Sequence, residues 1–306
     1  MAYVVAMYVG TIFSQADSGT DAEAIRRWAV TAEEAGFHHV MAYDHVLGAT
    51  VERLTGGAIG QFGEPPYPDQ STFHEILSLF SHLAGVTRRI EFVPSVIVLP
   101  QRQVQLVAKQ VATIDRLSGG RLHVAVGVGW NHAEYEAMGV DFVERAAILD
   151  EQVALMRQLL TQPLVTFDGR YHTLDRVGIN PLPDRPIPIW VGSRGSDAAM
   201  RRVVRIADGW MPLIMAGVDP YPVGERVVRL RQLCDEAGRD PATLPVWGRV
   251  YIDTSDSWQA ATEEAAALGF THLSVGFNRF AHPPTPHDEH LATVIRMLDG
   301  VRAITG

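Results

Sequence analysis

The side chains best suited to chemistry in this sequence follow predicted β-strands. Asp44 and His45 come directly after the apolar run 39–43. An imidazole titrates near neutral pH, so His45 is a candidate proton donor or acceptor. Asp44 could orient that imidazole, or it could be an ordinary turn residue at the end of a strand. Because of this position at a strand end, we take His45 and Asp44 as the candidate catalytic residues.

The segment 192–196 predicts an anion-binding site. It supplies clustered backbone N–H donors, two hydroxyl groups and a guanidinium immediately before a predicted helix. A helix N-terminus that follows glycines attracts anions, and Arg194 would add a charge-assisted contact. A helix cap that binds nothing is the alternative interpretation. The candidate ligands of a phosphate are Val191, Gly192, Ser193, Arg194 and Gly195.

A proline interrupts another apolar run. Pro94 is followed by Ser95 and Val96 within the predicted strand 90–99. Because proline removes a hydrogen-bond donor from a sheet, it predicts a bulge at this point. Such a bulge would push the backbone of Ser95 and Val96 toward a bound ligand, unless it is an irregularity without consequence.

Glycines mark a further strand end. They remove side chains where a strand leaves the sheet, which lets a planar ring or a phosphate approach the backbone. Tight packing of the strand against its loop explains them equally well. The third glycine of a dinucleotide-binding fingerprint is missing. The candidate cofactor-binding residues here are Gly127, Val128, Gly129, Trp130 and Asn131.

These side chains need a scaffold that brings strand ends together. Short β-branched runs alternate with amphipathic segments along the chain, which is typical of βα units and a parallel sheet. The predicted strands are residues 3–9, 39–43, 90–99, 122–128, 187–191, 209–213, 246–252 and 272–277. This number of strands predicts a (β/α)8 TIM barrel, whose active site lies at the carboxyl ends of its strands.

Two segments depart from the βα alternation. Residues 164–174 predict a β-hairpin around Asp168 and Gly169, within an insertion at about 162–182. Residues 48–71 form a long stretch rich in glycine and proline, and loops of that length are often functional lids. No interdomain linker is evident, so we expect one barrel domain spanning residues 1–306.

Composition excludes several classes of protein. The net charge of −9 argues against nucleic-acid binding, and no apolar run is long enough to span a bilayer. A single cysteine, Cys234, precludes an intramolecular disulfide and fits a cytoplasmic protein. The spacing of His282, His287 and His290 fits no recognised metal site, so no metal is expected.

Longer stretches carry a family resemblance. They are residues 94–102, 108–110, 113–121 and 126–130. In this order they resemble the luciferase-like monooxygenase superfamily, and most closely its deazaflavin (coenzyme F420)-dependent oxidoreductase branch. The resemblance extends over nearly the whole chain, so it is specific for the superfamily. It is much less specific for the cofactor or the substrate.

The resemblance implies a TIM barrel with a tricyclic cofactor across its C-terminal mouth. It places a cis peptide bond at Ser95–Val96, the cofactor phosphate at 191–195 and the active-site histidine at His45. Sugar-phosphate dehydrogenases of this branch have a glutamate where this chain has Trp130. We therefore do not assign that substrate class, and Trp130 could instead stack near the ring or shape an apolar pocket.

Four functions remain to be weighed. F420-dependent hydride transfer to or from a small organic substrate, with a proton at His45, is the leading hypothesis. A monooxygenase that uses reduced FMN is the alternative. A cofactor-free phosphate-binding barrel is less favoured, because the only lysine, Lys109, lies on a predicted helix and disfavours a Schiff base. A non-catalytic flavin-binding protein is also less favoured. By analogy with the family we expect a homodimer.

Overall fold

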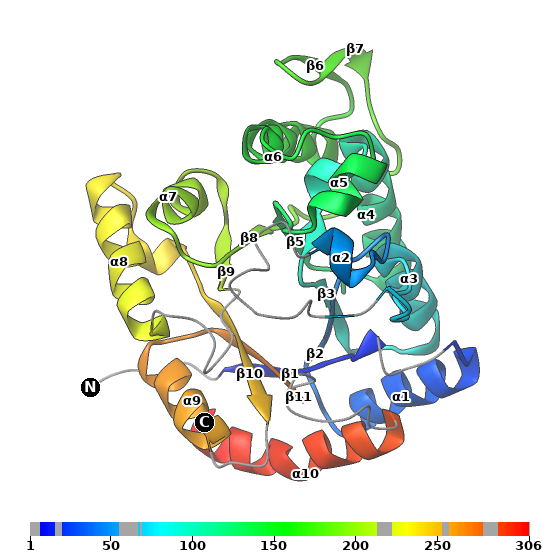
Figure 1. Cartoon of the computed structure of the whole chain (residues 1–306), viewed down its shortest axis with the longest axis vertical. Coiled ribbons are helices and arrows are strands. Elements are labelled where there is room, and N and C mark those ends of the chain that lie inside the picture. The colour runs from blue at the N-terminus through cyan, green and yellow to red at the C-terminus, as the bar shows by residue number, and fades with distance from the viewer. Residues whose placement is uncertain are drawn as a thin grey trace.

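The computed structural model describes residues 7–15, 20–54, 67, 69–212, 222–252, 257–277 and 287–305. Parallel strands form the centre of the molecule (Figure 1). Their bounds are β1 (Tyr8–Ile12), β2 (His39–Ala42), β3 (Glu91–Pro94), β4 (Ile97–Val98), β5 (Val124–Gly127), β8 (Ile189–Ser193), β9 (Gly209–Pro212), β10 (Trp247–Ile252) and β11 (His272–Phe277).

The strands form two sheets that meet at both borders. One sheet has the order β10-β11-β1-β2-β3, and the other has the order β4-β5-β8-β9. Single parallel bridges, Phe92 to Leu122 and Trp210 to Val246, join them. The strands therefore follow one another around a ring in chain order, which is the arrangement of the predicted (β/α)8 barrel.

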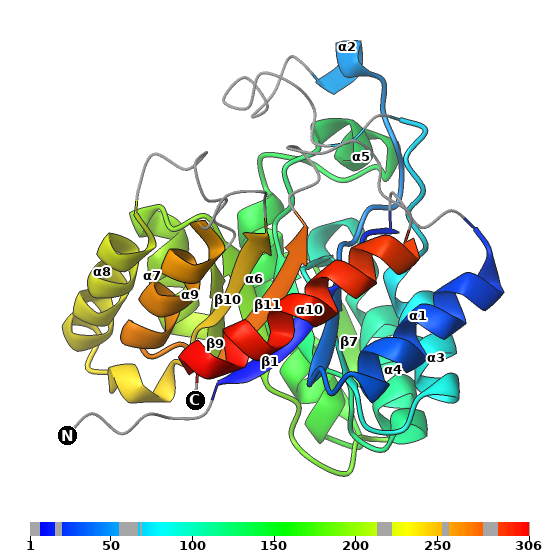
Figure 2. The ribbon, with the colours of Figure 1, turned by 90° about the horizontal axis from the view of Figure 1, so that it is seen from below.

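Helices cover the outside of this ring, and Figure 2 shows α1, α9 and α10 packed outside the β10-β11-β1 region. Their bounds are α1 (Ala22–Glu34), α2 (Val51–Leu54), α3 (Ile76–Val86), α4 (Val104–Ser118), α5 (His132–Ala137), α6 (Arg145–Thr161), α7 (Asp197–Ile206), α8 (Val223–Glu236), α9 (Ser257–Ala267) and α10 (His287–Thr305). Across the described part of the chain, none of these helices has the length and apolarity that crossing a membrane requires.

The third predicted strand is two strands in the structure. The run 90–99 divides into β3 and β4, and the peptide bond between Ser95 and Val96, at the break, is cis as predicted. The division has a simple cause, because Pro94 ends β3 and removes a ladder donor. The first strand lies later in the chain than the predicted range 3–9: β1 spans Tyr8–Ile12, and residues 3–6 lie outside the described residues.

The predicted hairpin is present. β6 (Val165–Asp168) pairs in antiparallel register with β7 (Thr173–Val177), and the pair projects beyond α6 at the top of Figure 1. Most of the loop predicted at 48–71 falls on residues 55–66 and 68, which lie outside the described residues. The same is true of the structure around His282.

Strand alternation divides the buried side chains into two clusters. The larger cluster lies between the ring of strands and the helices, and it includes Val250 and Val275. The smaller cluster fills the inside of the ring, and its members are Ile12, Met41, Val93, Val96, Ala125, Trp190, Met211 and Trp247. Tyr43 and Tyr251 pack against this interior cluster, and both lie at carboxyl ends of strands. The polar side chains described below therefore lie above a closed apolar interior.

Candidate active site

The predicted site residues follow the carboxyl ends of neighbouring parallel strands. His45 follows β2, Ser95 follows β3, Gly127 ends β5, and Ser193 ends β8. In a barrel these ends lie on one face, and the loops after them form the site. The structure thus brings the four predicted groups to the same end of the barrel.

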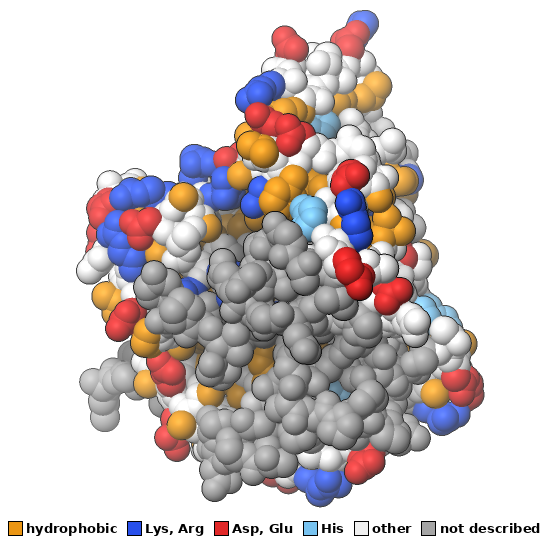
Figure 3. Space-filling view, in the orientation of Figure 1, with side chains coloured by type: hydrophobic (Ala, Val, Ile, Leu, Met, Phe, Trp, Pro, Cys, Tyr) orange, Lys and Arg blue, Asp and Glu red, His pale blue; other side chains and the backbone are white. Residues whose placement is uncertain are grey.

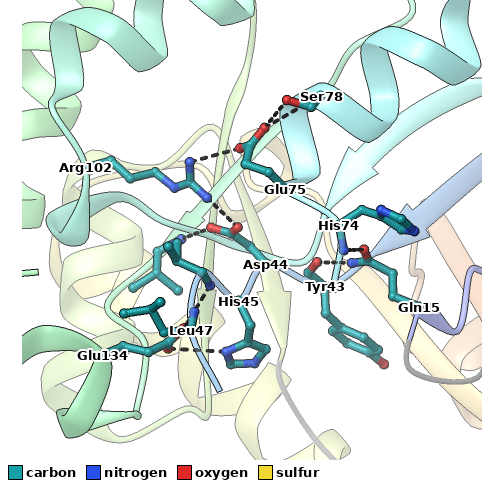
Figure 4. Close-up of polar contacts among 12 residues, drawn as sticks. Gln15, Tyr43, Asp44, His45, Leu47, His74, Glu75, Ser78, Arg102 and Glu134 are labelled. Carbon is teal, nitrogen blue, oxygen red and sulfur yellow. Dashed lines mark hydrogen bonds and ion pairs between the residues drawn. The ribbon is translucent and has the colours of Figure 1, made fainter. Parts of the chain in front are cut away.

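His45 is held by two side chains from distant segments. Its Nδ1 lies 2.7 Å from the hydroxyl oxygen of Tyr67 and 3.3 Å from Oε2 of Glu134. The His45 side chain is only 13% exposed. Figure 4 shows the Glu134 carboxylate beside the imidazole. Among the described residues, no hydrogen-bond partner of Nε2 is found, which leaves that nitrogen available for a ligand.

Glu134 is positioned by the start of α5. Oδ1 of Asn131 caps this helix by accepting from the backbone N–H groups of Ala133 and Glu134. Oε1 of Glu134 in turn accepts from the N–H groups of Val46 and Leu47, at 2.9 and 3.0 Å. One buried carboxylate therefore fixes both the His45 ring and the backbone that follows it.

The charge of Glu134 determines which nitrogen of His45 carries a proton. Burial alone would raise the pKa of Glu134, but hydrogen bonds from His45 and from two backbone N–H groups outweigh it, so the pKa lies below its ordinary value. A carboxylate accepts only, so it favours a proton on Nδ1 of the imidazole. In the neutral ring Nε2 is then the proton acceptor. Burial also raises the pKa of Tyr67, which keeps that hydroxyl protonated.

Asp44 does not orient His45, contrary to one sequence-based expectation. Its Oδ2 accepts from the N–H of Val98 at 3.0 Å, and its Oδ1 pairs with Arg102 at 2.6 Å. Arg102 also pairs with Glu75, the N-cap of α3, at 3.0 Å (Figure 4). Burial raises the pKa of Asp44, and the Arg102 guanidinium only partly offsets this. Asp44 therefore ties the end of β2 to β4 and α4, and Glu134 is the residue that orients His45.

Aromatic rings surround His45. The ring centroids of Tyr67, Phe73 and Trp130 lie 4.3, 5.0 and 5.9 Å from that of His45. Tyr67 also contacts Phe73 and Trp130 edge to face. Trp130 therefore belongs to an apolar wall beside the imidazole.

The glycines after β5 have a packing role. A Cβ atom on Gly127 would lie 2.5 Å from Cγ2 of Val96, and one on Gly129 would lie 2.6 Å from Cγ1 of Val98. Gly129 also has a φ of +61°, which disfavours other residues. The space that these glycines leave is filled by valines of the third strand region, so the packing interpretation explains why glycine is needed here.

The predicted anion-binding segment leads into α7. Ser196 is its N-cap and accepts from the N–H of Ala199, and Oγ of Ser193 accepts from Nε1 of Trp210 at 3.0 Å. Arginine side chains crowd the surface over α7 and α8 (Figure 3). The segment therefore leads directly into a helix N-terminus, whose backbone N–H groups can bind an anion.

The sequence did not reveal Arg226. This α8 residue is 6% exposed, and a Cβ atom on Gly195 would lie 2.7 Å from its Cδ. A buried guanidinium thus lies directly against the predicted phosphate segment. Arg226 is far from this segment in the sequence, and the fold brings the two together. Arg226 is one of several arginines in the same helix, so the sequence alone did not distinguish it from a surface residue.

Comparison with known proteins identifies the family. The family model described as "Luciferase-like monooxygenase" matches residues 5–299. The chain belongs to the luciferase-like monooxygenase family. An uncharacterised protein of Mycobacterium tuberculosis is 32% identical over 288 residues, which are 94% of this chain and 96% of that relative.

Solved luciferase-like structures have the same fold. Monooxygenase RslO1 from Streptomyces bottropensis superimposes with a TM-score of 0.71 at 18% identity, over 96% of this chain and 99% of its own. An F420-dependent secondary alcohol dehydrogenase superimposes with a TM-score of 0.64 at 18% identity, over 97% of this chain and 84% of its own. The luciferase-like neighbours thus include a monooxygenase and an F420-dependent enzyme.

Proposed function

We propose that this luciferase-like protein is an F420-dependent oxidoreductase that interconverts a small organic alcohol, or a similar substrate, with its oxidised form. The observation that carries the proposal is the buried Glu134 carboxylate against Nδ1 of His45 at the barrel mouth. That pair provides a positioned acid–base group, which alcohol–carbonyl interconversion needs. The F420-dependent alcohol dehydrogenase among the structural neighbours supports the same cofactor.

The residues present fit a phosphorylated tricyclic cofactor. The N-terminus of α7, Arg194 and the buried Arg226 suit its phosphate, since they combine backbone donors with guanidinium groups. The strand ends around Ser95 and Val96 suit its ring. When bound, the deazaflavin would supply the two-electron chemistry of the reaction.

The protein's own part in this reaction is proton transfer and exclusion of water. With Glu134 holding the Nδ1 proton, Nε2 of His45 accepts the proton of a substrate hydroxyl during oxidation and returns it in the reverse direction. The aromatic wall of Tyr67, Phe73 and Trp130 favours an apolar substrate body and keeps water from the imidazole.

A monooxygenase that uses reduced FMN is the second candidate. The superposition with monooxygenase RslO1, which covers almost all of both chains, favours it. Visible spectra of the purified protein titrated with F420 and with FMN separate the two candidates. Saturable spectral changes with F420 alone support the first proposal, and changes with FMN alone replace it by the second.

The same titration tests the phosphate segment. We expect Arg194→Ala to weaken cofactor binding by roughly 1.5–3 kcal/mol, the scale of a hydrogen bond to a charged group, and Ser193→Ala to cost less. Arg205→Ala is the control, because Arg205 lies at the other end of α7 and pairs with Asp150. Equal cofactor affinities in the wild type and both site variants would show that the cofactor phosphate binds at another segment.

The catalytic role of His45 has its own test. We expect His45→Gln and His45→Ala to reduce turnover by about 10²–10⁴-fold, with little change in cofactor affinity, because the phosphate segment lies on another strand end. His82→Gln is the control, since His82 is an exposed histidine on α3. The assay uses the bound cofactor and a panel of alcohols, ketones and enones. Turnover equal to that of the wild type would show that His45 is structural.

We also propose that the protein is a homodimer and lies in the cytoplasm. The family resemblance supports the first, and a lone buried thiol at Cys234 supports the second. Light scattering during size-exclusion chromatography measures the assembly, and we expect a mass twice the 33.6 kDa of one chain. A mass of 33.6 kDa would exclude the dimer.

A further inference from the structure

A second polar cluster lies in the barrel mouth, apart from His45. It begins on the inward face of β10, where Trp247, Arg249 and Tyr251 alternate with outward residues. Trp247 belongs to the interior cluster and Tyr251 packs against it, whereas Val250 packs outside the ring. Arg249 therefore points into the barrel, one layer above a fully buried tryptophan.

The guanidinium of Arg249 reaches across the barrel. Nη1 donates to Oγ of Ser95 at 3.3 Å, and Nη2 donates to the carbonyl oxygen of Pro212 at 3.5 Å. Ser95 follows β3 and Pro212 ends β9, so one cation connects the ends of strands on opposite sides of the ring. Ser95 is the first residue of the cis bond described above.

Two tyrosines complete the cluster. The hydroxyl oxygens of Tyr43 and Tyr251 lie 2.5 Å apart. Burial and the neighbouring Tyr251 raise the pKa of Tyr43 well above its ordinary value, although Arg249 acts in the opposite direction. The Tyr43 phenol therefore stays protonated. A hydrogen bond between two phenols uses only one of their two O–H donors, so the pair still presents one donor to a further acceptor.

We propose that Arg249, Tyr43 and Tyr251 form an oxyanion-binding floor, which stabilises negative charge on a carbonyl oxygen at the barrel mouth. Preorganised donors and a fixed positive charge act most strongly where charge develops in a site shielded from water. This inference rests on the proposed function and deepens it, because it assigns an electrostatic role to residues that do not contact His45.

The electron balance of the proposed reaction shows where such charge arises. Oxidation of an alcohol releases two electrons and two protons. Both electrons and one proton would pass to the deazaflavin as a hydride, and His45 would take the other proton. A reduced deazaflavin would carry one additional negative charge, which its carbonyl oxygens would share. In the reverse direction, charge develops on the carbonyl oxygen of the substrate. The floor suits either oxygen, and charge placed near such a ring changes its electronics.

The experiment compares the affinities of the oxidised and reduced cofactor, without turnover. Dissociation constants of Arg249→Gln, Arg249→Lys and Tyr43→Phe are measured anaerobically with oxidised and reduced F420, and with FMN if FMN is the form that binds. We expect Arg249→Gln to weaken binding of the reduced form about 10-fold more than that of the oxidised form, the scale of one charge-assisted contact. Arg249→Lys should retain part of the preference for the reduced cofactor, because lysine keeps the positive charge.

Arg121→Gln is the matched control. Arg121 is a part-buried arginine whose guanidinium donates to carbonyl oxygens and to a threonine hydroxyl near the amino end of β3, far from the mouth. Its removal should leave the ratio of the two affinities unchanged. Thermal unfolding of every variant verifies the fold, and Tyr43→Phe supplies the test if Arg249→Gln does not fold.

A second arm distinguishes the source of the oxygen. Acetophenone is titrated into the oxidised complex and followed through the visible spectrum of the ring. A change in the ratio of the dissociation constants for reduced and oxidised cofactor assigns the oxygen to the ring. An unchanged ratio together with weaker acetophenone binding assigns the oxygen to the substrate. If Arg249→Gln and Tyr43→Phe change neither quantity, the floor is overturned while the proposed function stands. If the wild type binds neither cofactor, the proposed function fails and this inference fails with it.

Discussion

At the residue scale, the proton chemistry of this protein depends on a pair rather than on one histidine. His45 supplies the imidazole ring, and Glu134 orients that ring and holds the backbone after β2. A positioned imidazole is useful as an acid or base only when its reactive nitrogen is defined. The buried carboxylate is therefore as necessary to the proposed reaction as the imidazole.

Glu134→Gln tests this dependence. Glutamine can still accept from the N–H groups of Val46 and Leu47, but it lacks the charge that favours the Nδ1 proton of His45. We expect turnover to fall by up to about 10⁴-fold, with unchanged cofactor affinity, as when the carboxylate that orients the catalytic histidine of a serine protease becomes an amide. Glu136→Gln is the control, because Glu136 lies on the same helix and pairs with Arg53 at the surface. Equal losses in both variants would point to damage of α5 instead.

At the element scale, a chain of charges holds the mouth loops together. Asp44 after β2, Arg102 before α4 and Glu75 at the start of α3 form one connected group. The Asp44 side chain is 1% exposed and that of Arg102 is 13% exposed, so the pair is shielded from water. Removing one partner from such a pair leaves the other charge uncompensated.

We therefore expect Arg102→Gln to destabilise the protein by about 3–5 kcal/mol at neutral pH. The loss should shrink as the pH falls, because the folded-state pKa of Asp44 is already raised and its protonation removes the uncompensated charge. Denaturant unfolding at several pH values measures both effects. Arg116→Gln is the control: Arg116 pairs with Asp184 at the surface, and such pairs contribute less than about 1 kcal/mol. A loss of that small size for Arg102→Gln would contradict the expectation.

At the scale of the whole molecule, the two ends of the barrel serve different purposes. The carboxyl ends of the strands hold the His45–Glu134 pair and the predicted anion-binding segment. The amino ends hold a histidine cluster, in which His123 pairs with Glu91 at 2.5 Å, His39 bonds to Ser274 at 2.6 Å and His272 stacks on Trp247. Catalytic residues lie at the first end of such barrels, and residues at the second end serve stability.

The histidine cluster makes stability depend on pH. Burial lowers the pKa of His272 to about 3, and burial also lowers that of His39 well below its ordinary value. Neighbouring histidines add to both shifts, and Glu91 opposes that of His272. These groups bind protons more readily in the unfolded chain, so their stabilising effect is complete above pH 6.5 and is lost as the pH falls from 6.5 toward 3.

Urea unfolding between pH 8 and pH 5 measures this effect, above the range in which most carboxylates titrate. We expect the free energy of unfolding to fall by up to about 1.4 kcal/mol per pH unit for each of the two histidines. His272→Gln should flatten the slope, and His82→Gln, at an exposed position on α3, should not. A free energy of unfolding that is constant over this range would contradict the assignment of the shifts to the folded state.

The sequence by itself determined the barrel, the approximate place of every strand except the first, and the positions of two candidate groups at strand ends. Alternation of β-branched runs with amphipathic segments is local information, and a parallel barrel puts every strand end on one face. His45 and the segment 191–195 follow predicted strands directly, so their place in the site could be read from the chain. Pro94 likewise predicted an irregularity at Ser95 and Val96, where the structure divides the third strand into β3 and β4.

Only the tertiary structure decided which side chains meet. Glu134 contacts His45 from 89 residues away, and Arg249 contacts Ser95 from 154 residues away. The valines that fill the space beside Gly127 and Gly129 likewise come from another strand. Spacing along a chain predicts neighbours within one helix or strand, whereas these contacts depend on the order in which the strands close the ring. The physical reason is that a barrel converts distant strand ends into a single surface, and only its closure sets the distances between them.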